Sequence, residues 1–265
     1  MTGLPATVTD ALRRGSPTTY LPGGGYTIVQ TPSRRDFWFG NCLIPNEAPS
    51  LASYEGWLER CRDTFAGVPI EKLIVQWETA AEVDDAVRPQ PGAVEFDVSR
   101  VLVLSGTPNI LRRAGVASRP LSSDADWAAA TALERVEQRF DLAGMAAFFA
   151  WRMGLLRAAS ERGDAIVLGA FAGDALVAFA GCYASEAWIR LTTPITATPF
   201  RRRGLFSTLF SNAVGEAYRR FPKAKTVVVS EPGSAPERLY RTLGFAPAGY
   251  QYALLAPLTI GARLA

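Results

Sequence analysis

The sequence contains no histidine among its 265 residues. This absence excludes Ser-His-Asp and Cys-His catalytic groups, and it excludes zinc sites that depend on imidazole ligands. Any general acid or base in this protein must therefore be a carboxylate, a tyrosine, a lysine or a cysteine.

Cysteine is also scarce. The three cysteines, Cys42, Cys61 and Cys182, lie far apart in the sequence and form no CxxC pair. Such spacing predicts reduced, half-buried thiols in a cytoplasmic protein, rather than a disulfide framework or a metal site. We therefore expect no bound metal.

The net charge is only +3, which is too small to indicate a nucleic-acid or membrane partner by itself. Hydrophobic residues make up 48% of the chain and charged residues 20%, as in globular proteins.

Residues 1–20 contain charges and prolines without an apolar core, so we expect no signal peptide.

Long apolar runs are few. Residues 165–184 are almost wholly apolar, but Asp174 follows Gly173 near the centre of the run. An ionised aspartate at the centre of a membrane would cost roughly 2.5–3.5 kcal/mol. A Gly-Asp pair between two β-like runs instead predicts a hairpin turn, so we expect no membrane span.

A chain of 265 residues exceeds the usual single-domain size, which predicts two domains. Residues 1–25, with three prolines and the run Gly23-Gly24-Gly25, predict a flexible arm that has at most one helical turn, around Thr9 to Arg14. Residues 26–115 and 116–265 then form an N-terminal and a C-terminal domain. Thr107 to Pro120, punctuated by proline and glycine, is the expected connection between them.

The first half alternates between strand-like and helix-like patterns. We expect strands over 36–44, 72–78 and 93–104, a helix from Ser50 to about Phe65, and a short helix over 80–87. This order predicts an α/β layer structure. No catalytic group of residues stands out in this half.

The second half is easier to interpret. Two helices are expected over 125–140 and 142–161, and three strands over 165–171, 175–184 and 188–197. An amphipathic helix follows from about 205 to 218, and then a buried strand over 226–229. Ser234 to Glu237 has the form of a capping box that opens a helix to Leu243, and a closing strand includes residues 250–255.

The run Arg201-Arg202-Arg203-Gly204-Leu205-Phe206 lies between a strand and a helix of this half. A helix that begins at such a turn directs free backbone N–H groups and the positive end of its dipole toward one point. This arrangement predicts an anion site. The alternative is a solvated basic turn before an ordinary helix.

Two motifs give these elements a family resemblance. The GCN5-related N-acetyltransferase (GNAT) superfamily has a strand, then [Arg/Gln]-x-x-Gly-x-[Gly/Ala], then a helix. Arg201 to Phe206 fits this motif except that Phe206 replaces the small last residue. The family's second motif, Leu-Tyr-x-x-Leu-Gly-Phe, is matched in full by Leu239 to Phe245. Residues 117–258 thus resemble a GNAT domain.

The first half resembles the family more weakly. Its segment Phe37-Trp38-Phe39-Gly40-Asn41 and the following helix look like the N-terminal half of tandem GNAT proteins, in which one copy is degenerate. The resemblance therefore implies a mixed, splayed, mostly antiparallel sheet flanked by helices. A second, GNAT-like α/β domain would precede it.

In this family the pyrophosphate of acetyl-CoA sits on the first motif. The resemblance therefore implies cofactor contacts at Arg201, Arg202, Arg203, Gly204, Leu205 and Phe206. The pantetheine arm would pair with the preceding strand at Ile195 and Thr196, and Pro194 favours an edge or bulge there. Phe206 would crowd the site.

The implied reaction moves an acetyl group from acetyl-CoA to a primary amine of a small molecule or peptide. Tyr240 matches the family's general acid, which protonates the leaving sulfur, and an N–H near Thr196 would stabilise the oxyanion. Glu231 is our candidate base, acting through water, with Glu186 in reserve. The family often has Asn where this chain has Gly233, so one contact with the cofactor is missing.

Two other functions stay open. Phe206 and the missing Asn would also suit a non-catalytic protein that binds or senses acyl-CoA. A nucleic-acid-binding protein could use Arg201–Arg203 with Arg219, Arg220, Lys223 and Lys225, although a solvated helix face is the simpler interpretation. The amine, the acyl length and the choice between monomer and homodimer are left open.

Overall fold

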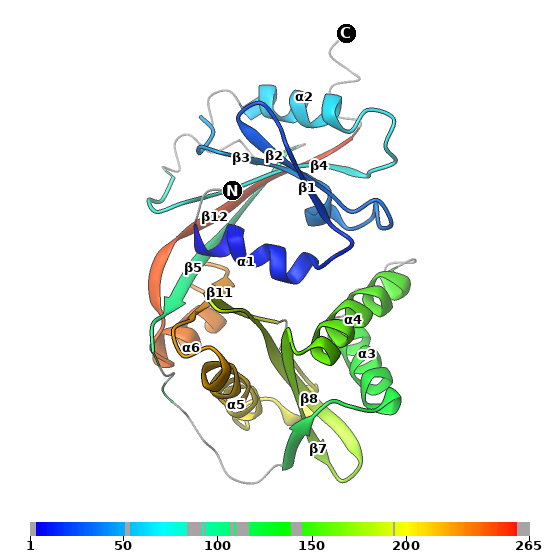
Figure 1. The fold of residues 1–265 in the computed structure, drawn as a ribbon, viewed down its shortest axis with the longest axis vertical. Coiled ribbons are helices and arrows are strands. Elements are labelled where there is room, and N and C mark those ends of the chain that lie inside the picture. Colours follow the sequence, from blue (N-terminus) through cyan, green and yellow to red (C-terminus); the bar gives the residue numbers. More distant parts are fainter. Residues whose placement is uncertain are drawn as a thin grey trace. The chain divides into compact units, whose positions relative to one another are not determined.

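The computed structural model describes residues 4–50, 54–83, 92, 94–106, 109, 117–138, 145–192 and 194–258. These residues form two compact units. Unit 1 comprises residues 1–102, 229–237 and 247–265, and unit 2 comprises residues 103–228 and 238–246. Figure 1 traces both units in the colours of the sequence.

Unit 1 contains two α-helices, one short 3-10 helix and a six-stranded sheet among its described residues. The sheet order is β1-β2-β3-β4-β12-β5. The elements are α1 (Pro5–Arg14), β1 (Thr19–Pro22), β2 (Tyr26–Gln30), η1 (Trp38–Gly40), β3 (Cys42–Pro45), α2 (Tyr54–Thr64), β4 (Lys72–Thr79), β5 (Glu95–Leu104) and β12 (Ala246–Pro257).

Side chains of β4 alternate between the two faces of this sheet, as strand geometry requires. One face carries aromatic rings: Trp77 stacks on Tyr252 with centroids 5.6 Å apart, and these residues share a core with Leu58 and Phe65 of the α2 region. The other face has an apolar cluster that includes Ile74 and Leu255, and beside it Gln76 and Glu78 make polar contacts with α1. Figure 1 shows α1 and α2 on opposite sides of this sheet.

The first helix is held by a residue far along the chain. Glu78 of β4 accepts hydrogen bonds from the backbone N–H groups of Ala6 (3.2 Å) and Thr7 (2.8 Å). Its carboxylate therefore caps the N-terminus of α1, where Leu4 at the N-cap supplies no side-chain bond. The stretch that we expected to be a flexible arm thus contains an anchored helix and a strand.

The remaining sequence expectations for this half differ in detail. Residues 36–44 form η1 and then β3, instead of one strand. Of the expected helix over 80–87, residues 80–83 are not helical, and 84–87 lie outside the described residues. Residues 107, 108 and 110–116 of the expected connection lie outside them too.

The compact units differ from the division at 115/116 that the sequence suggested. β12 comes after the second motif, yet it pairs antiparallel with β4 over eight residue pairs, from Tyr250↔Thr79 to Pro257↔Lys72. Such a long ladder ties residues 247–257 to unit 1.

The remaining described helices and strands lie in unit 2, except for the parts of two of them that fall within residues 229–237 of unit 1. The sheet order is β11-β9-β8-β7-β6, and β10 continues along β8 beyond β9. The elements are β6 (Ala117–Pro120), α3 (Asp124–Gln138), α4 (Met145–Arg162), β7 (Ala165–Ala172), β8 (Ala175–Ala184), β9 (Trp188–Leu191), β10 (Ile195–Thr196), η4 (Thr198–Phe200), α5 (Leu205–Arg220), β11 (Lys225–Ser230) and α6 (Ala235–Thr242).

Most strand pairs in unit 2 are antiparallel, whereas β9 and β11 are parallel and are joined by α5. Helix α5 packs on one face of β8, where the Cys182 thiol lies 3.7 Å from the carbonyl of Ala213. Figure 1 shows α3 and α4 on the other side of β8. The expected mixed, mostly antiparallel sheet flanked by helices is confirmed.

The two units share one arrangement. In unit 1, β3 pairs parallel with β4 and α2 connects them. In unit 2, β9 pairs parallel with β11 and α5 connects them. Both crossovers need a helix because parallel strands cannot be joined by a tight turn. The weak resemblance between the halves thus has a structural counterpart.

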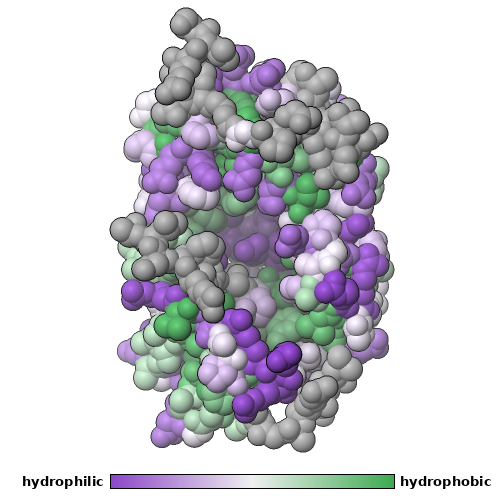
Figure 2. Space-filling view, turned by 180° about the vertical axis from the view of Figure 1, so that it is seen from behind, coloured by the Kyte–Doolittle hydropathy of each residue, from purple (hydrophilic) through white to green (hydrophobic). Residues whose placement is uncertain are grey.

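Few large hydrophobic side chains face solvent. Among the described residues, Leu21 and Val136 are the large hydrophobic side chains classed as exposed. Figure 2 shows hydrophilic and hydrophobic side chains interspersed on one face of the molecule. Within the described part of the chain, no helix is both long and apolar enough to cross a bilayer.

Candidate active site

The strand that leads into the first motif is interrupted. On β8 the pairing partners advance three positions, from Cys182 to Phe179, while β9 and β10 advance four, from Leu191 to Ile195. One extra residue is therefore accommodated beside Pro194, which is a β-bulge. The sequence signal at Pro194 correctly predicted an irregular strand here.

Beyond this bulge β10 follows β8, while the described pairs between β9 and β11 end at Arg190↔Val227. Ala197 donates its N–H to Val177 on β8 (2.9 Å). Because N–H groups alternate along a strand, Thr196 directs its own N–H and C=O away from β8, and Ile195 directs its groups toward β8. Of the two residues expected to meet pantetheine, Thr196 therefore faces the open edge.

The turn after η4 prepares the N-terminus of α5. Arg202 has φ 60° and Gly204 has φ 77°, both in the left-handed region. Gly204 is the N-cap residue, and no side chain caps the helix. The first helical bond runs from the Thr208 N–H to the Gly204 carbonyl (3.0 Å). Helix geometry then leaves the N–H groups of residues 205–207 without acceptors inside the helix.

The three arginines of this turn are all exposed at their side chains, but they have different surroundings. Arg201 contacts Glu137 of α3 at 2.6 Å and donates from Nε to the Thr196 carbonyl (3.2 Å). Arg203 lies over the Phe200 ring, 5.0 Å from its centroid. The positive charge at the turn therefore comes from Arg202, Arg203 and the helix dipole, because Glu137 neutralises Arg201.

Phe206 is the second residue of α5 and packs against the hydrophobic core beneath this helix. Its ring stacks on Phe210 with centroids 5.7 Å apart and meets Tyr240 edge-on at 6.1 Å. Phe210 and Phe245 complete the group around Tyr240 at 6.5 and 5.8 Å. The structure therefore brings the two sequence motifs together through aromatic contacts.

Tyr240 is buried, with only 5% of its surface exposed. Burial raises the pKa of its hydroxyl to about 12, although the charge of Arg190 on β9 opposes the increase. The hydroxyl therefore stays protonated at neutral pH. Arg190 is itself buried in the sheet, and sequence reasoning missed it because a single arginine in a strand is usually solvated.

The helix that carries the second motif, α6, begins with the expected capping box. The Ser234 hydroxyl accepts a bond from the Glu237 N–H (3.2 Å), and the Glu237 carboxylate accepts one from the Gly233 N–H (2.6 Å). Glu231, our candidate base, is exposed in the loop after β11, and Glu186 is exposed in the turn before β9. The role of each as a base stays a prediction.

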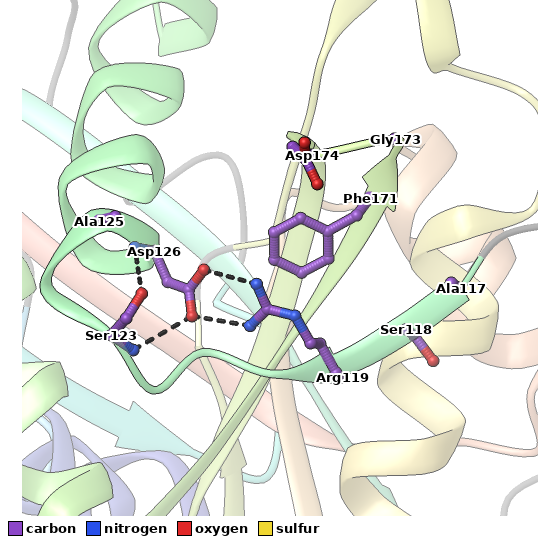
Figure 3. A pocket seen from close by; sticks show the side chains of 9 residues that line it. All are labelled: Ala117, Ser118, Arg119, Ser123, Ala125, Asp126, Phe171, Gly173 and Asp174. Carbon is purple, nitrogen blue, oxygen red and sulfur yellow. Dashed lines mark hydrogen bonds and ion pairs between the residues drawn. The ribbon is translucent and has the colours of Figure 1, made fainter.

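A separate pocket of about 420 Å³ lies in unit 2 between the start of α3 and the hairpin of β7 and β8. Figure 3 shows the Arg119 guanidinium between the carboxylate of Asp126 and the ring of Phe171. Asp126 accepts two bonds from Arg119, at 2.7 and 2.8 Å, and bonds from the N–H groups of Ser122 and Ser123. These contacts fix the start of α3.

The described residues contain no group of three or more Cys, Asp and Glu side chains that could hold a metal ion. The basic residues considered for nucleic acid are partly paired: Arg219 and Arg220 both contact Glu216, one turn earlier on α5. The simpler interpretation of these two arginines, a solvated helix face, agrees with this pairing.

Comparisons with known proteins place this geometry in context. No model of a protein family matches the sequence, and no curated protein matches it. Solved structures do match. A conserved protein of unknown function from Staphylococcus epidermidis has a TM-score of 0.72 and 12% identity, over 90% of this chain and 94% of its own.

Two further structures carry the GNAT name. A GCN5-related N-acetyltransferase from Kribbella flavida has a TM-score of 0.64 and 18% identity, over 97% of each chain. A tandem GNAT protein from the clavulanic acid biosynthesis pathway has a TM-score of 0.53 and 13% identity, over 91% of this chain and 78% of its own. At these identities the likeness concerns the fold. Over nearly its whole length, the chain has the GNAT fold.

Proposed function

We propose that the protein is an N-acyltransferase that moves an acetyl group from acetyl-CoA to a primary amine. The observation that carries the proposal is the uncapped N-terminus of α5, which a short 3-10 helix and a turn connect to a bulged strand with an open edge. Acetyl-CoA would supply the activated thioester. The turn and the N-terminus of α5 would bind its pyrophosphate, and the bulged strand would bind its pantetheine arm and place its thioester.

The donor groups at the turn suit a pyrophosphate. Three helical N–H groups and the positive end of the α5 dipole face the turn, and Arg202 and Arg203 add formal charge. Glycine at the N-cap places no Cβ between the helix and an approaching phosphate. Phe206 does not remove these contacts, because main-chain groups make them and its ring packs on Phe210.

The open edge of β10 suits an extended amide arm. Thr196 directs its backbone N–H to that edge, and strand-like pairing needs such a donor. The same N–H, placed near the reacting carbonyl, would stabilise the negative charge that develops on its oxygen. Ile195 would contribute through the ladder that fixes β10 on β8.

Tyr240 would protonate the departing thiolate. Its hydroxyl remains neutral because the surrounding aromatic rings and low exposure disfavour the phenolate. A positioned acid of this kind contributes about 10²–10⁴-fold to the rate. Glu231 would accept the proton of the amine through water, since the sequence offers no imidazole for this task.

The test has two arms. Acetyl-CoA should raise the melting temperature of the protein, as must any ligand that binds only the folded state. Release of CoA thiol should then be measured against a panel of amines: polyamines, amino acids, aminoglycosides and peptide N-termini. An unchanged melting temperature at millimolar acetyl-CoA would reject the proposal.

One observation favours a second candidate, a non-catalytic acyl-CoA-binding protein. Phe206 stands where the GNAT motif has a small residue, and it fills the space beside Tyr240 with an aromatic ring. This candidate predicts a thermal shift with acetyl-CoA but no CoA release with any amine. It also predicts that Tyr240→Phe leaves every measured property unchanged except stability.

A further inference from the structure

Glu137 lies near the end of α3, 61 residues before Thr198 and 64 before Arg201, and neither GNAT motif includes it. Its two carboxylate oxygens reach the turn that follows β10. One oxygen accepts a bond from the Thr198 N–H (2.8 Å), and the other accepts from the Thr198 hydroxyl (2.8 Å) and from Arg201 (2.6 Å). One side chain therefore fixes both ends of the segment from 198 to 201.

Arg201 extends this set of contacts to the open edge of β10. While its Nη2 contacts Glu137, its Nε donates to the Thr196 carbonyl at 3.2 Å. Thr196 is the residue that directs its groups away from β8. Arg201 therefore donates a hydrogen bond to the carbonyl of Thr196, and the N–H of Thr196 remains the group that faces a ligand at this edge.

The charge on Glu137 suits this role. Its side chain is only 10% exposed, although Arg201 is half-exposed at 51%. The Thr198 N–H lowers the pKa of the Glu137 carboxyl below its usual value, with further contributions from the Thr198 hydroxyl and Arg201. Hydrogen bonds to a charged carboxylate are stronger than neutral ones, so the contacts persist without a ligand.

We propose that Glu137 is a positioning residue for the cofactor turn, and that Arg201 acts inward on Glu137 and Thr196 instead of on the phosphates. In this division, Arg202, Arg203 and the N–H groups of α5 meet the pyrophosphate. The inference rests on the proposed function for its ligand. It assigns different tasks to arginines that the family motif treats alike.

The physical benefit is preorganisation. A turn that must order itself when the ligand arrives loses part of its binding free energy to that ordering. With the contacts of Glu137 in place, residues 196–204 already hold the conformation that aims the α5 N–H groups. Loss of the carboxylate charge should therefore weaken cofactor binding while leaving the chemical step almost unchanged.

The experiment compares Glu137→Gln with a matched control, Glu216→Gln. Glu216 also pairs with arginines, but it lies near the C-terminal end of α5. With free CoA as the probe in calorimetry, Glu137→Gln should weaken binding by about 10-fold, as expected for lost preorganisation. In turnover the KM for acetyl-CoA should rise similarly, with kcat changed less than about twofold. The control should match the unaltered protein.

Hydrogen exchange separates this inference from the proposed function, because it needs no ligand. In the ligand-free protein, Glu137→Gln should speed exchange at the N–H groups of Thr198 and its neighbours, and not at those in the second half of α5. If CoA does not bind but exchange rises in this pattern, Glu137 still positions the turn and only the proposed function fails. Unchanged exchange at Thr198 would overturn the inference.

Substitutions of the arginines test the division of tasks. Arg201→Lys keeps the charge near Glu137 but removes the Nε donor to Thr196. It should raise the KM for acetyl-CoA and speed exchange in the same turn. Arg202→Gln and Arg203→Gln should weaken CoA binding without a change in hydrogen exchange in this turn. The loss of CoA affinity in these two variants should be smaller at high salt, because salt screens the charges. If Arg201→Gln weakens CoA binding while Glu137→Gln does not, Arg201 contacts the phosphates directly and the inference is wrong.

Discussion

The ring of Phe206 meets the ring of Tyr240 edge-on, with centroids 6.1 Å apart and planes at 77°. Edge-to-face contacts of this kind stabilise a pair beyond the area that it buries. Phe206 is the last residue of the first motif and lies in the first turn of α5, and Tyr240 belongs to the second motif. The residue that departs from the GNAT pattern is thus the one that joins the two motifs.

Replacement of Tyr240 by phenylalanine tests the acid. The substitution removes one oxygen atom and preserves the aromatic contacts, so CoA binding should stay the same. We expect kcat to fall by about 10²–10⁴-fold, the usual contribution of a positioned acid. Tyr218→Phe is the control. It also removes a tyrosine hydroxyl from unit 2, but this hydroxyl contacts Thr226 (3.1 Å) and has no role in the proposed mechanism. Equal turnover in both variants would remove Tyr240 from the mechanism.

Phe206→Ala tests the contact itself. The substitution opens a cavity beside Tyr240 and should destabilise the protein by about 1–3 kcal/mol, less than for a fully buried phenylalanine. We also expect a lower kcat, because Tyr240 loses a neighbour that fixes its ring. On a Tyr240→Phe background, Phe206→Ala should lower kcat no further. Independent effects of the two substitutions on kcat would contradict this interpretation.

The pH dependence of turnover follows from the burial of Tyr240. A general acid must be protonated, so activity would fall as pH rises through its pKa. Burial raises that pKa to about 12, which places the fall above the range in which most proteins are assayed. Below about pH 10, the rate of the unaltered protein should therefore show no alkaline decline that can be assigned to Tyr240, that is, none that disappears in Tyr240→Phe. Such a decline would mean that the hydroxyl is far less buried during turnover.

Two glycines near α5 make a matched pair. Gly204 has a left-handed backbone at φ 77°, and Gly215 lies within the helix with open space around the position of a Cβ. Gly204→Ala should strain the turn and weaken CoA binding. Gly215→Ala should leave binding unchanged and stabilise the protein by about 0.5–1 kcal/mol, because alanine favours helix. Calorimetry with CoA and chemical denaturation measure the two effects.

Asp126 should make stability depend on acid. Hydrogen bonds from Arg119 lower the pKa of its carboxyl, with help from the N–H groups of Ser122 and Ser123. A carboxyl with a lowered folded-state pKa stabilises the protein above its unfolded pKa, and that stabilisation is lost as pH falls through the folded value. Asp126→Asn should therefore lower the melting temperature most near pH 7. The difference should shrink below about pH 4, near the usual aspartate pKa.

Local signals allowed much of this fold to be predicted. The capping box at Ser234 and the periodic apolar residues after Gly204 predicted α6 and α5, since each signal lies within the element that it describes. The contact between Phe206 and Tyr240 agrees with the resemblance to the GNAT superfamily, because each residue belongs to one of the two motifs that carry that resemblance. The partner of Arg201 could not be predicted in this way, because Glu137 lies 64 residues earlier and carries no motif.

The length of the N-terminal helix was underestimated for the same reason: the sequence suggested at most one turn, around Thr9 to Arg14, where the structure has a helix from Pro5 to Arg14. Pro5 at its first position is a common start signal, but the cap that completes it is Glu78, 71 residues later than Thr7. The pairing of β12 with β4 is also non-local. Sequence patterns predicted a closing strand, but they did not indicate which strand it would pair with. A strand pattern of this kind suits any sheet with a buried face.

The position of β12 has a consequence for synthesis on the ribosome. Strands β4 and β5 are made early, yet the strand that lies between them in the sheet is not complete until residue 257 has emerged. Unit 2 ends at residue 246, so all of its residues have been made before β12 is complete. Until then β4 exposes an unpaired hydrophobic edge, which is the interval in which a chaperone would serve this chain.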